Sequence, residues 1–300
     1  MDEMSKPIRF VATFVAGQET TFDDATVERA LREAGATATC IDWLAPGVAA
    51  DAFLAGEGNA AFRFRQHEAL AGKPIDVVVQ PLEGRRKALL VADMDSTMIE
   101  QECIDELADF AGMRDRISII TERAMAGELA FEAALQERVA LLAGVTLEQI
   151  ETLVARITLT PGARTLVATM RAHGAHTALV SGGFTQFTQP VAARIGFHEM
   201  RANRLEIADG ALTGVVLAPI QGREGKRAAL AEMREARGLS HGATLAIGDG
   251  ANDLDMLREA GLGVAYHAKP KVAEAAHARI DHADLTALLY AQGYRREEFV

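Results

Sequence analysis

Cysteine and long apolar runs are scarce in this 300-residue chain. Its two cysteines, Cys40 and Cys103, lie far apart in the sequence, so we expect no structural disulfide. No apolar run approaches the ~20 residues that a membrane-spanning helix needs. Met1–Arg9 also lacks the apolar centre of a secretory signal. These absences predict a cytoplasmic protein without a membrane partner.

The chain also lacks a basic tract. Its 42 acidic and 31 basic residues give a formal net charge of -11, which argues against nucleic acid as the principal partner. A phosphate ligand is not excluded, because a local site with a cation, a lysine and helix N-termini can be electropositive on an acidic protein. With 49% hydrophobic residues, the chain can bury a sizeable core and form two or three compact units.

Two carboxylates and two hydroxyls follow the apolar run 88–92 in the pentapeptide Asp-Met-Asp-Ser-Thr, residues 93–97. Residues i and i+2 of an extended chain project to the same side, so Asp93 and Asp95 can face one small volume. Their charges repel each other unless a hard cation such as Mg2+ lies between them. For the pentapeptide alone, a solvated turn that uses Asp and Ser as turn formers is the alternative.

Three further polar segments occur where apolar runs end or helical patterns begin. Ser-Gly-Gly-Phe at 181–184 follows an apolar run, and its hydroxyl and amides at a helix start can bind phosphate oxygens. Lys226 opens a helical stretch and can place a fixed positive charge beside a phosphoryl group. Gly-Asp-Gly-Ala-Asn-Asp at 248–253 concentrates two acids and an amide in a tight turn. Taken singly, Ser-Gly-Gly is typical of an ordinary loop, and a lysine at a helix start is typically a solvated surface residue.

Strand and helix patterns alternate through the last two-thirds of the chain and predict an α/β fold with a doubly wound parallel sheet. The expected strands are 88–92, 176–180, 244–247 and 262–266, and the expected helices are 163–173, 185–195 and 227–237. Ligands of such sheets gather at the carboxyl ends of the strands, where the polar motifs fall. A hairpin with a primed turn is predicted across Asp209-Gly210.

Between residues 102 and 156 the apolar residues recur at helical spacing, which predicts a small helical cap inserted into the core. On a helix beginning near Phe131, Arg138 shares a face with Phe131, Leu135 and Leu142. An arginine in an apolar stripe can bind an anion. From spacing alone, an arginine that snorkels to water or pairs with an acid is slightly favoured.

Residues 1–80 predict a small α+β module of βαββ(α)β type. The expected strands are 10–15, 36–43, 60–64 and 75–79, with a helix at 27–34. No residue here identifies a ligand, so amino-acid binding, dimerisation and a purely structural role all stay open. Residues 81–86 are the expected linker.

In their order along the chain and in their residues, these motifs resemble those of the haloacid dehalogenase (HAD) superfamily, within its phosphoserine phosphatase branch. The resemblance covers about residues 86–289 and includes Ala-Asn-Arg-Leu at 202–205 besides the motifs above. It implies a HAD-like catalytic core over 87–101 and 157–300 and a C1-type helical cap over 102–156. The N-terminal module resembles an ACT-like, ferredoxin-like domain weakly.

The resemblance also implies a role for each acid of the site. Asp93 would be the nucleophile that forms an aspartyl-phosphate, and Asp95 would be the acid and base. Mg2+ would be held by the Asp93 carboxylate, the Asp95 backbone carbonyl and Asp249. Asp253 would support this set from behind.

The remaining roles concern the two ends of the substrate. The resemblance implies that Ser181, Gly182, Gly183 and Lys226 bind the phosphoryl group, with Lys226 offsetting charge in the transition state. Residues expected to contact the serine moiety are Arg138 at the carboxylate, Glu102 at the ammonium, Met125 and Phe131 in the apolar lid, and Asn252.

The activity implied is Mg2+-dependent hydrolysis of O-phospho-L-serine to L-serine and phosphate, the final step of serine biosynthesis. One alternative keeps the chemistry but transfers the phosphoryl group to an alcohol such as homoserine, or acts on another small phosphate. The other is a non-catalytic amino-acid sensor built on the N-terminal module. A homodimer is left open.

Overall fold

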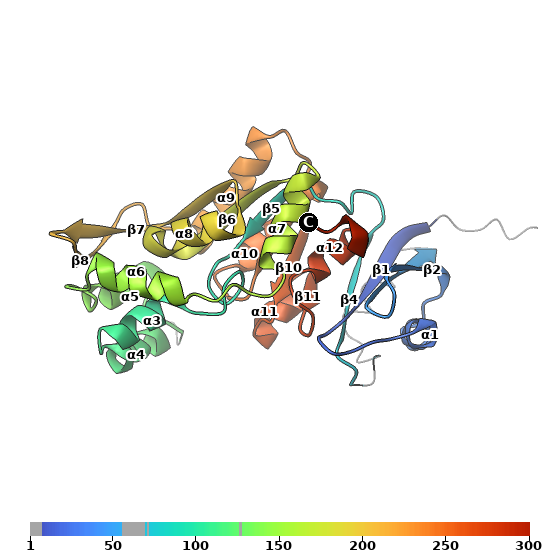
Figure 1. Cartoon of the computed structure of the whole chain (residues 1–300), viewed down its shortest axis with the longest axis horizontal. Coiled ribbons are helices and arrows are strands. Elements are labelled where there is room, and N and C mark those ends of the chain that lie inside the picture. The colour runs from blue at the N-terminus through green and yellow to red at the C-terminus, as the bar shows by residue number, and fades with distance from the viewer. Residues whose placement is uncertain (1–7, 56–69, 71, 126–127) are drawn as a thin grey trace, which may run out of the picture.

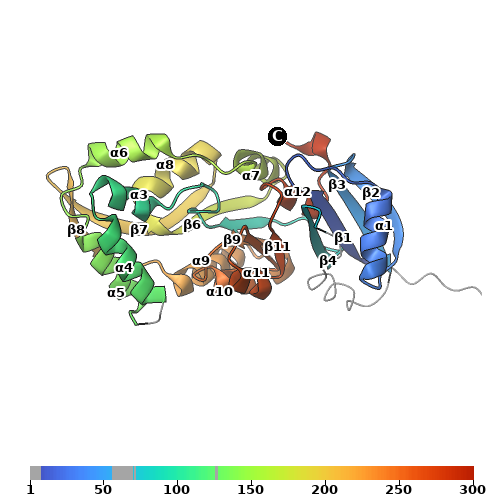
Figure 2. The same ribbon diagram turned by 90° about the horizontal axis from the view of Figure 1, so that it is seen from below.

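The computed structural model describes residues 8–55, 70, 72–125 and 128–300. Two β-sheets organise the described chain (Figure 1). The N-terminal residues form a four-stranded sheet beside the C-terminal elements of a larger seven-stranded sheet (Figures 1 and 2). No helix within the described ranges is both long enough and apolar enough to cross a membrane.

The N-terminal sheet has the strand order β2-β3-β1-β4, and its neighbouring strands are antiparallel. Its elements are β1 (Ile8–Ala16), α1 (Asp24–Glu33), β2 (Ala38–Ala45), β3 (Ala49–Ala55) and β4 (Ile75–Pro81). Strand β3 was not predicted from the sequence, and the strand expected at 60–64 lies outside the described residues. Because β3 lies between β1 and β2, the β1-α1-β2 unit is a split βαβ unit.

Six strands of the larger sheet are parallel, as the alternating pattern predicted. The order is β11-β10-β9-β5-β6-β7-β8, and β8 alone runs antiparallel to its neighbour. The strands are β5 (Leu89–Ala92), β6 (His176–Phe184), β7 (Glu199–Ala208), β8 (Ala211–Leu217), β9 (Thr244–Gly248), β10 (Leu262–Tyr266) and β11 (Ala278–Ile280). Strands β5, β9 and β10 are buried along their whole length, as expected for strands covered on both faces.

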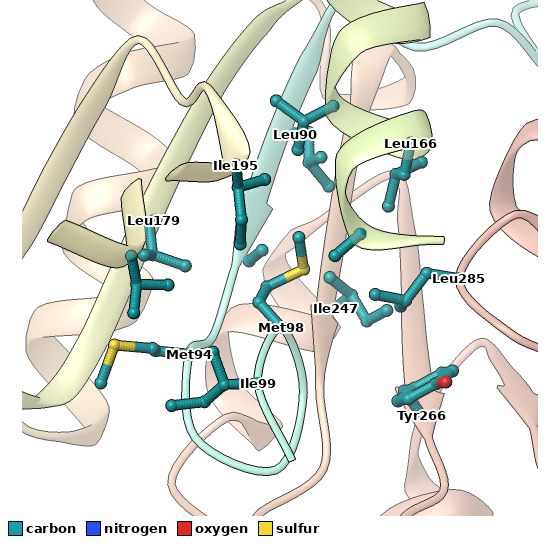
Figure 3. Close-up of a cluster of buried hydrophobic side chains, with 14 of the residues drawn as sticks. Leu90, Met94, Met98, Ile99, Leu166, Leu179, Ile195, Ile247, Tyr266 and Leu285 are labelled. Carbon is teal, nitrogen blue, oxygen red and sulfur yellow. The ribbon is translucent and has the colours of Figure 1, made fainter. Parts of the chain in front are cut away.

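Alternate residues of β5 build two separate cores, one on each face of the sheet. Leu90 and Ala92 join a cluster with α7 (Ala163–Ala172), α8 (Thr185–Ile195) and α12 (Ala287–Ala291). Leu89 and Val91 join the second cluster with α9 (Arg223–Ala236), α10 (Leu254–Glu259) and α11 (Pro270–Ala275). Figure 3 shows part of the first cluster. This arrangement follows directly from the two-residue period of a strand.

The inserted segment is helical, as predicted. It contains α3 (Cys103–Phe110), α4 (Arg114–Met125), α5 (Phe131–Ala140) and α6 (Leu147–Arg156). The predicted hairpin connects β7 and β8, and both Asp209 (φ 50°) and Gly210 (φ 77°) have the positive φ of a primed turn. Gly214 in this hairpin packs so closely on α5 that an added Cβ would lie 3.2 Å from the Ala140 Cα atom.

Polar contacts attach the N-terminal sheet to the core. The Asp76 carboxylate on β4 accepts backbone N–H bonds from residues 281, 282 and 283, at 2.8, 3.1 and 2.7 Å. Arg85 forms an ion pair of 2.7 Å with the buried Asp51 on β3 and donates to the backbone carbonyl of Ala291. The segment expected as a linker therefore contains a residue that holds both sheets.

Candidate active site

The first acidic motif begins where β5 ends. The Asp93 amide continues the sheet ladder by donating to the Ile247 carbonyl at 3.0 Å, and the chain then turns through Ser96, whose φ is 52°. Met94 and Met98 of this turn point into the core (Figure 3) and are fully buried. The two methionines thus anchor the loop that presents Asp93 and Asp95.

Parallel strands end at the same edge of a sheet, and this brings the second acidic motif beside the first. β9 pairs with β5 and ends at Gly248, directly before Asp249. The nearest carboxylate oxygens of Asp93, Asp249 and Asp253 lie within 4.8 Å of one another. A Cβ on Gly248 would stand 2.5 Å from the Asp253 carboxyl carbon, so only glycine leaves room for this packing.

Lys226 enters the acidic cluster from the first turn of α9. Its Nζ atom lies 2.6 Å from Asp93 Oδ1 and 2.7 Å from Asp253 Oδ1, and the residue is 0% exposed. Burial acts to lower the pKa of Lys226, but the charges of Asp253 and Asp93 outweigh it and raise that pKa. The lysine is therefore a fixed buried cation, and the alternative of a solvated surface residue is wrong.

Burial and mutual repulsion disfavour charge on the acids of the cluster. Burial, followed by the charge of Asp253, raises the pKa of Asp93 well above its usual range. The same two causes raise the pKa of Asp249 to about 6. Thr97 donates to Asp249 Oδ1 at 3.1 Å, and the Gly250 amide donates to Asp253 at 3.0 Å. Three carboxylates thus face one ammonium group.

Asp95 connects the acidic loop to the start of the helical segment at α3. Its Oδ1 atom accepts the Cys103 backbone N–H at 3.0 Å, and Ser181 Oγ lies 3.5 Å from Oδ2. Burial is the largest cause that raises the pKa of Asp95. A raised pKa favours the protonated form, which can donate a proton to a leaving group.

The Ser-Gly-Gly segment differs from its prediction in one respect. The expected strand ended at residue 180, whereas β6 continues to Phe184, and α8 begins directly after it at Thr185, as expected. The pairing register of β6 with β7 breaks between Val180 and Phe184. Ser181 is buried and its Oγ accepts the Gly183 N–H at 2.8 Å, while a Cβ on Gly183 would lie 3.0 Å from Asp95 Oδ2.

Two charged residues expected at the serine moiety, Glu102 and Arg138, lie within electrostatic reach of each other in the helical segment. Glu102 directly precedes α3 and accepts a hydrogen bond from Ser96 Oγ at 2.7 Å. Burial, followed by the charge of Asp95, raises the pKa of Glu102 to about 7. Burial lowers the pKa of Arg138, while the nearby charges of Asp105 and Glu102 oppose that shift. Arg138 and Glu102 are therefore electrostatic neighbours.

The other residues expected at the serine moiety are placed less uniformly. Phe131, 39% exposed at the start of α5, reaches the core, where a Cβ on Gly222 would lie 3.1 Å from its ring. Asn252 is half-buried in the acidic turn. Met125 ends α4, and its side chain lies outside what the structure describes. Leu135 and Leu142 of the Arg138 stripe are buried, as expected.

Comparison with known proteins places this arrangement in a family. Residues 90–258 match the family model described as haloacid dehalogenase-like hydrolase. The chain belongs to the haloacid dehalogenase-like hydrolases. A "Phosphoserine phosphatase" from Streptomyces coelicolor is 40% identical over 98% of this chain and 70% of its own length.

Solved structures of HAD hydrolases share the fold beyond the matched residues. A HAD family hydrolase from Salmonella enterica serovar Typhi covers 95% of this chain and 98% of its own, with a TM-score of 0.84 and 30% identity. A probable phosphoserine phosphatase from Vibrio cholerae covers 99% of this chain and 90% of its own, with a TM-score of 0.77 and 30% identity.

The acidic cluster of this HAD hydrolase suits a hard divalent cation. Carboxylate and carbonyl oxygens are the ligands that Mg2+ prefers. One buried ammonium does not balance the buried carboxylates, and a divalent cation would. Asp253 was expected behind the metal ligands, whereas the Asp253 carboxylate lies within the cluster itself.

Three polar residues that support the HAD site received no role from the sequence. Ser96 holds Glu102, Thr97 holds Asp249, and Asn203 bonds the backbone of residues 182 and 221. Ser96 and Thr97 lie in the acidic pentapeptide, which could have indicated them. Asn203 lies in the Ala-Asn-Arg-Leu motif, but its bonding partners depend on the folded chain.

Proposed function

We propose that the chain is a phosphoserine phosphatase, which hydrolyses O-phospho-L-serine to L-serine and phosphate in serine biosynthesis. The observation that carries this proposal is that Glu102, which accepts a hydrogen bond from Ser96 of the acidic loop, has the cationic Arg138 as an electrostatic neighbour. The names of the Streptomyces and Vibrio proteins support the same substrate.

Asp93 is the proposed nucleophile. One of its carboxylate oxygens attacks phosphorus as the bond to the serine oxygen breaks, and this forms an aspartyl-phosphate. Lys226, in contact with Asp93, favours the ionised form of this buried carboxyl group and positions it. The ammonium group also offsets negative charge that develops on the phosphoryl oxygens.

Asp95 is the proposed acid and base. It protonates the departing serine oxygen and then removes a proton from the water that hydrolyses the aspartyl-phosphate. The Cys103 amide fixes its carboxyl group at the boundary between core and cap. Phosphate then leaves, and Asp93 returns to its free form.

The Ser181 hydroxyl and the amides of Gly182 and Gly183 are the proposed phosphoryl-binding groups. The Asp93 and Asp249 carboxylates and the Asp95 backbone carbonyl would hold Mg2+, which supplies positive charge to the phosphoryl oxygens when bound. The position of Asp253 inside the acidic cluster supports a role in orienting Lys226.

Selectivity for an amino-acid phosphate is assigned to the cap. Arg138 can bind the substrate carboxylate with two parallel hydrogen bonds, and Glu102 can bind the ammonium. Met125 and Phe131 form the apolar lid, and Asn252 reaches the serine moiety from the core. A sugar or aryl phosphate would leave both charged groups unpaired.

The proposed domains follow the sequence boundaries: an ACT-like module over 1–80, a core over 87–101 and 157–300, and a cap over 102–156. The split βαβ order of the N-terminal sheet supports a ferredoxin-like module. Amino-acid binding by that module, a homodimer and a cytoplasmic location remain predictions.

Phosphate release from L-phosphoserine and from sugar, nucleotide and aryl phosphates tests the proposal, with Mg2+ or EDTA and with Asp93→Asn as the control. We expect metal-dependent turnover that favours phosphoserine and is lost in the variant. Turnover of other esters without phosphoserine would contradict the substrate. Transfer to homoserine would indicate a phosphotransferase, and amino-acid binding without any turnover would indicate a sensor.

A further inference from the structure

The side-chain amide of Asn203 joins two backbone segments of the active site. Its Nδ2 group donates to the Gly182 carbonyl at 2.8 Å and to the Gln221 carbonyl at 3.1 Å. Its Oδ1 atom accepts the Gln221 N–H at 2.5 Å. Asn203 is 1% exposed, so solvent competes little for these bonds.

The two joined segments carry the phosphoryl-binding groups. Gly182 lies between the Ser181 hydroxyl and the Gly183 amide at the end of β6. Gln221 directly precedes Gly222, whose carbonyl accepts the Lys226 N–H at 3.0 Å in the first turn of α9. The Asn203 amide therefore fixes one side of the phosphoryl site relative to the other.

The main-chain ladder does not hold this part of β6 on its own. The register of β6 and β7 shifts between Val180 and Phe184, and Phe184 pairs with Asn203 where the pairing resumes. Residues 181–183 thus lie in the interval where regular strand pairing is interrupted. A side-chain bond from β7 to Gly182 bridges that interval.

The same two segments form the surface that the cap aromatic residue contacts. A Cβ on Gly182 would lie 3.8 Å from the Phe131 ring, and one on Gly222 would lie 3.1 Å from it. Since Gln221 adjoins Gly222, a shift between the joined segments would change the backbone surface that the Phe131 ring contacts.

We propose that Asn203 is a positioning residue that sets the spacing between the Ser181–Gly183 segment and Lys226. This spacing also sets the surface on which the Phe131 ring packs. This inference rests on the proposed phosphatase function, because it concerns the same phosphoryl site. If this buried amide only stabilised the fold, its removal would lower the free energy of unfolding and leave phosphate affinity unchanged.

The test compares Asn203→Ala with Gln80→Ala in the full chain with Mg2+. Gln80 is a matched control because it is 4% exposed and its Nε2 group donates to the Ala291 carbonyl at 2.6 Å, in the contact between the two sheets. Inorganic phosphate is the probe, with affinity measured by calorimetry, and kcat/KM and Tm are measured in parallel. This probe tests the joint whichever ester proves to be the substrate.

We expect Asn203→Ala to lower kcat/KM and phosphate affinity between about tenfold and about a hundredfold, since small misplacements in an active site have effects of that size. Gln80→Ala should lower Tm while both quantities stay at the wild-type value. Phe131→Ala should lower kcat/KM much less in the Asn203→Ala variant than in the wild type, because the surface that Phe131 contacts is already displaced in that variant.

Wild-type phosphate affinity and kcat/KM in a folded Asn203→Ala protein with reduced Tm would overturn the proposal. Additive effects of the Phe131 and Asn203 substitutions would overturn its second part. If the alanine variant does not fold, Asn203→Asp retains the acceptor for Gln221 N–H and removes the Nδ2 donors. The same losses are expected of it, and unchanged phosphate affinity would again exclude positioning.

Discussion

The chemistry of the site depends on how few cations compensate its buried acids. Lys226 is the partner of both Asp93 and Asp253, and all three residues are buried. Removing one partner of such a group leaves uncompensated charge in a medium that solvates it poorly. A single substitution at Lys226 therefore affects stability and catalysis together.

Replacement of Lys226 by methionine should lower kcat by about 10²–10³-fold, the usual effect of losing one group that stabilises a transition state. The free energy of unfolding should fall by about 3–5 kcal/mol as the acids lose their counter-charge. Phosphoserine turnover and urea unfolding measure the two effects. A variant with wild-type turnover would contradict the role given to Lys226.

Glu102 should make substrate selection depend on pH. The pKa of Glu102 is raised from 4.5 to about 7, because the folded protein binds this proton more tightly than the unfolded chain does. The resulting contribution to the free energy of unfolding is fully present below pH 4.5 and is lost as the pH rises through 7. Only the ionised form attracts the substrate ammonium. The ratio of kcat/KM for phosphoserine to that for p-nitrophenyl phosphate should therefore fall by up to about tenfold per pH unit below 7.

Taking this ratio cancels the titration of Asp93 and Asp249, which acts on both substrates. Glu102→Gln should give a low ratio that does not change between pH 6 and 8. If that variant kept the pH dependence, a different group would be responsible for ammonium selection.

Arg138→Ala should reduce discrimination between phosphoserine and p-nitrophenyl phosphate by about 10²-fold, the effect of losing a charged hydrogen-bonded pair of about 3 kcal/mol. The aryl ester has no carboxylate, so its own kcat/KM should change little. Steady-state kinetics with both esters measure the change. Equal losses for both would show that the substitution disturbs the core rather than carboxylate binding.

At the scale of elements, sequence patterns predicted what repeats locally and missed what depends on distant partners. The strand ends that carry Asp93 and Asp249 follow runs of buried aliphatic residues, so periodicity located them. Strand β3 escaped because its sequence, Ala-Ala-Asp-Ala-Phe-Leu-Ala, is mostly alanine, a poor strand former. The bonds of Asn203 to residues 182 and 221 required the fold to be known.

The hairpin of β7 and β8 supports the cap helix that carries Arg138. Gly214 has a φ of 89°, and a Cβ there would lie 3.2 Å from Ala140 on α5. Gly214→Ala should raise KM for phosphoserine severalfold, because the new methyl group displaces α5. It should also lower the free energy of unfolding by about 1–3 kcal/mol through backbone strain.

Gly174→Ala is the matched control for this change. Gly174 has a similar φ of 83°, but an added Cβ would meet no atom within 4 Å. It should lose stability through the same strain and keep the wild-type KM. Equal KM values in both variants would show that the hairpin does not position the cap.

For the molecule as a whole, the N-terminal sheet and the core are joined by buried polar groups. Arg85 contacts Asp51 and three main-chain or hydroxyl oxygens, from Thr13, Tyr290 and Ala291. Asp76 is 5% exposed and fully engaged with residues 281–283. Loss of either contact would leave a charged side chain without its partner, which is unfavourable. The N-terminal sheet and the core should therefore unfold together.

Arg85→Ala tests this cooperativity against the neighbouring Arg86→Ala. The Asp51 side chain is 1% exposed, so loss of Arg85 should lower the free energy of unfolding by about 3–5 kcal/mol. Arg86 pairs with Glu298 at the surface, with 47% of its side chain exposed, and its loss should cost about 1 kcal/mol or less. Urea unfolding followed by far-UV circular dichroism and by Trp43 fluorescence measures both variants. The value of kcat should not change, because both arginines precede β5 and Asp93 follows its opposite end. Coincident transitions of the two signals would indicate one cooperative unit. An earlier transition of the Trp43 signal alone in the wild type would show that the N-terminal sheet unfolds separately. The Arg85 contact would then not couple this sheet to the core.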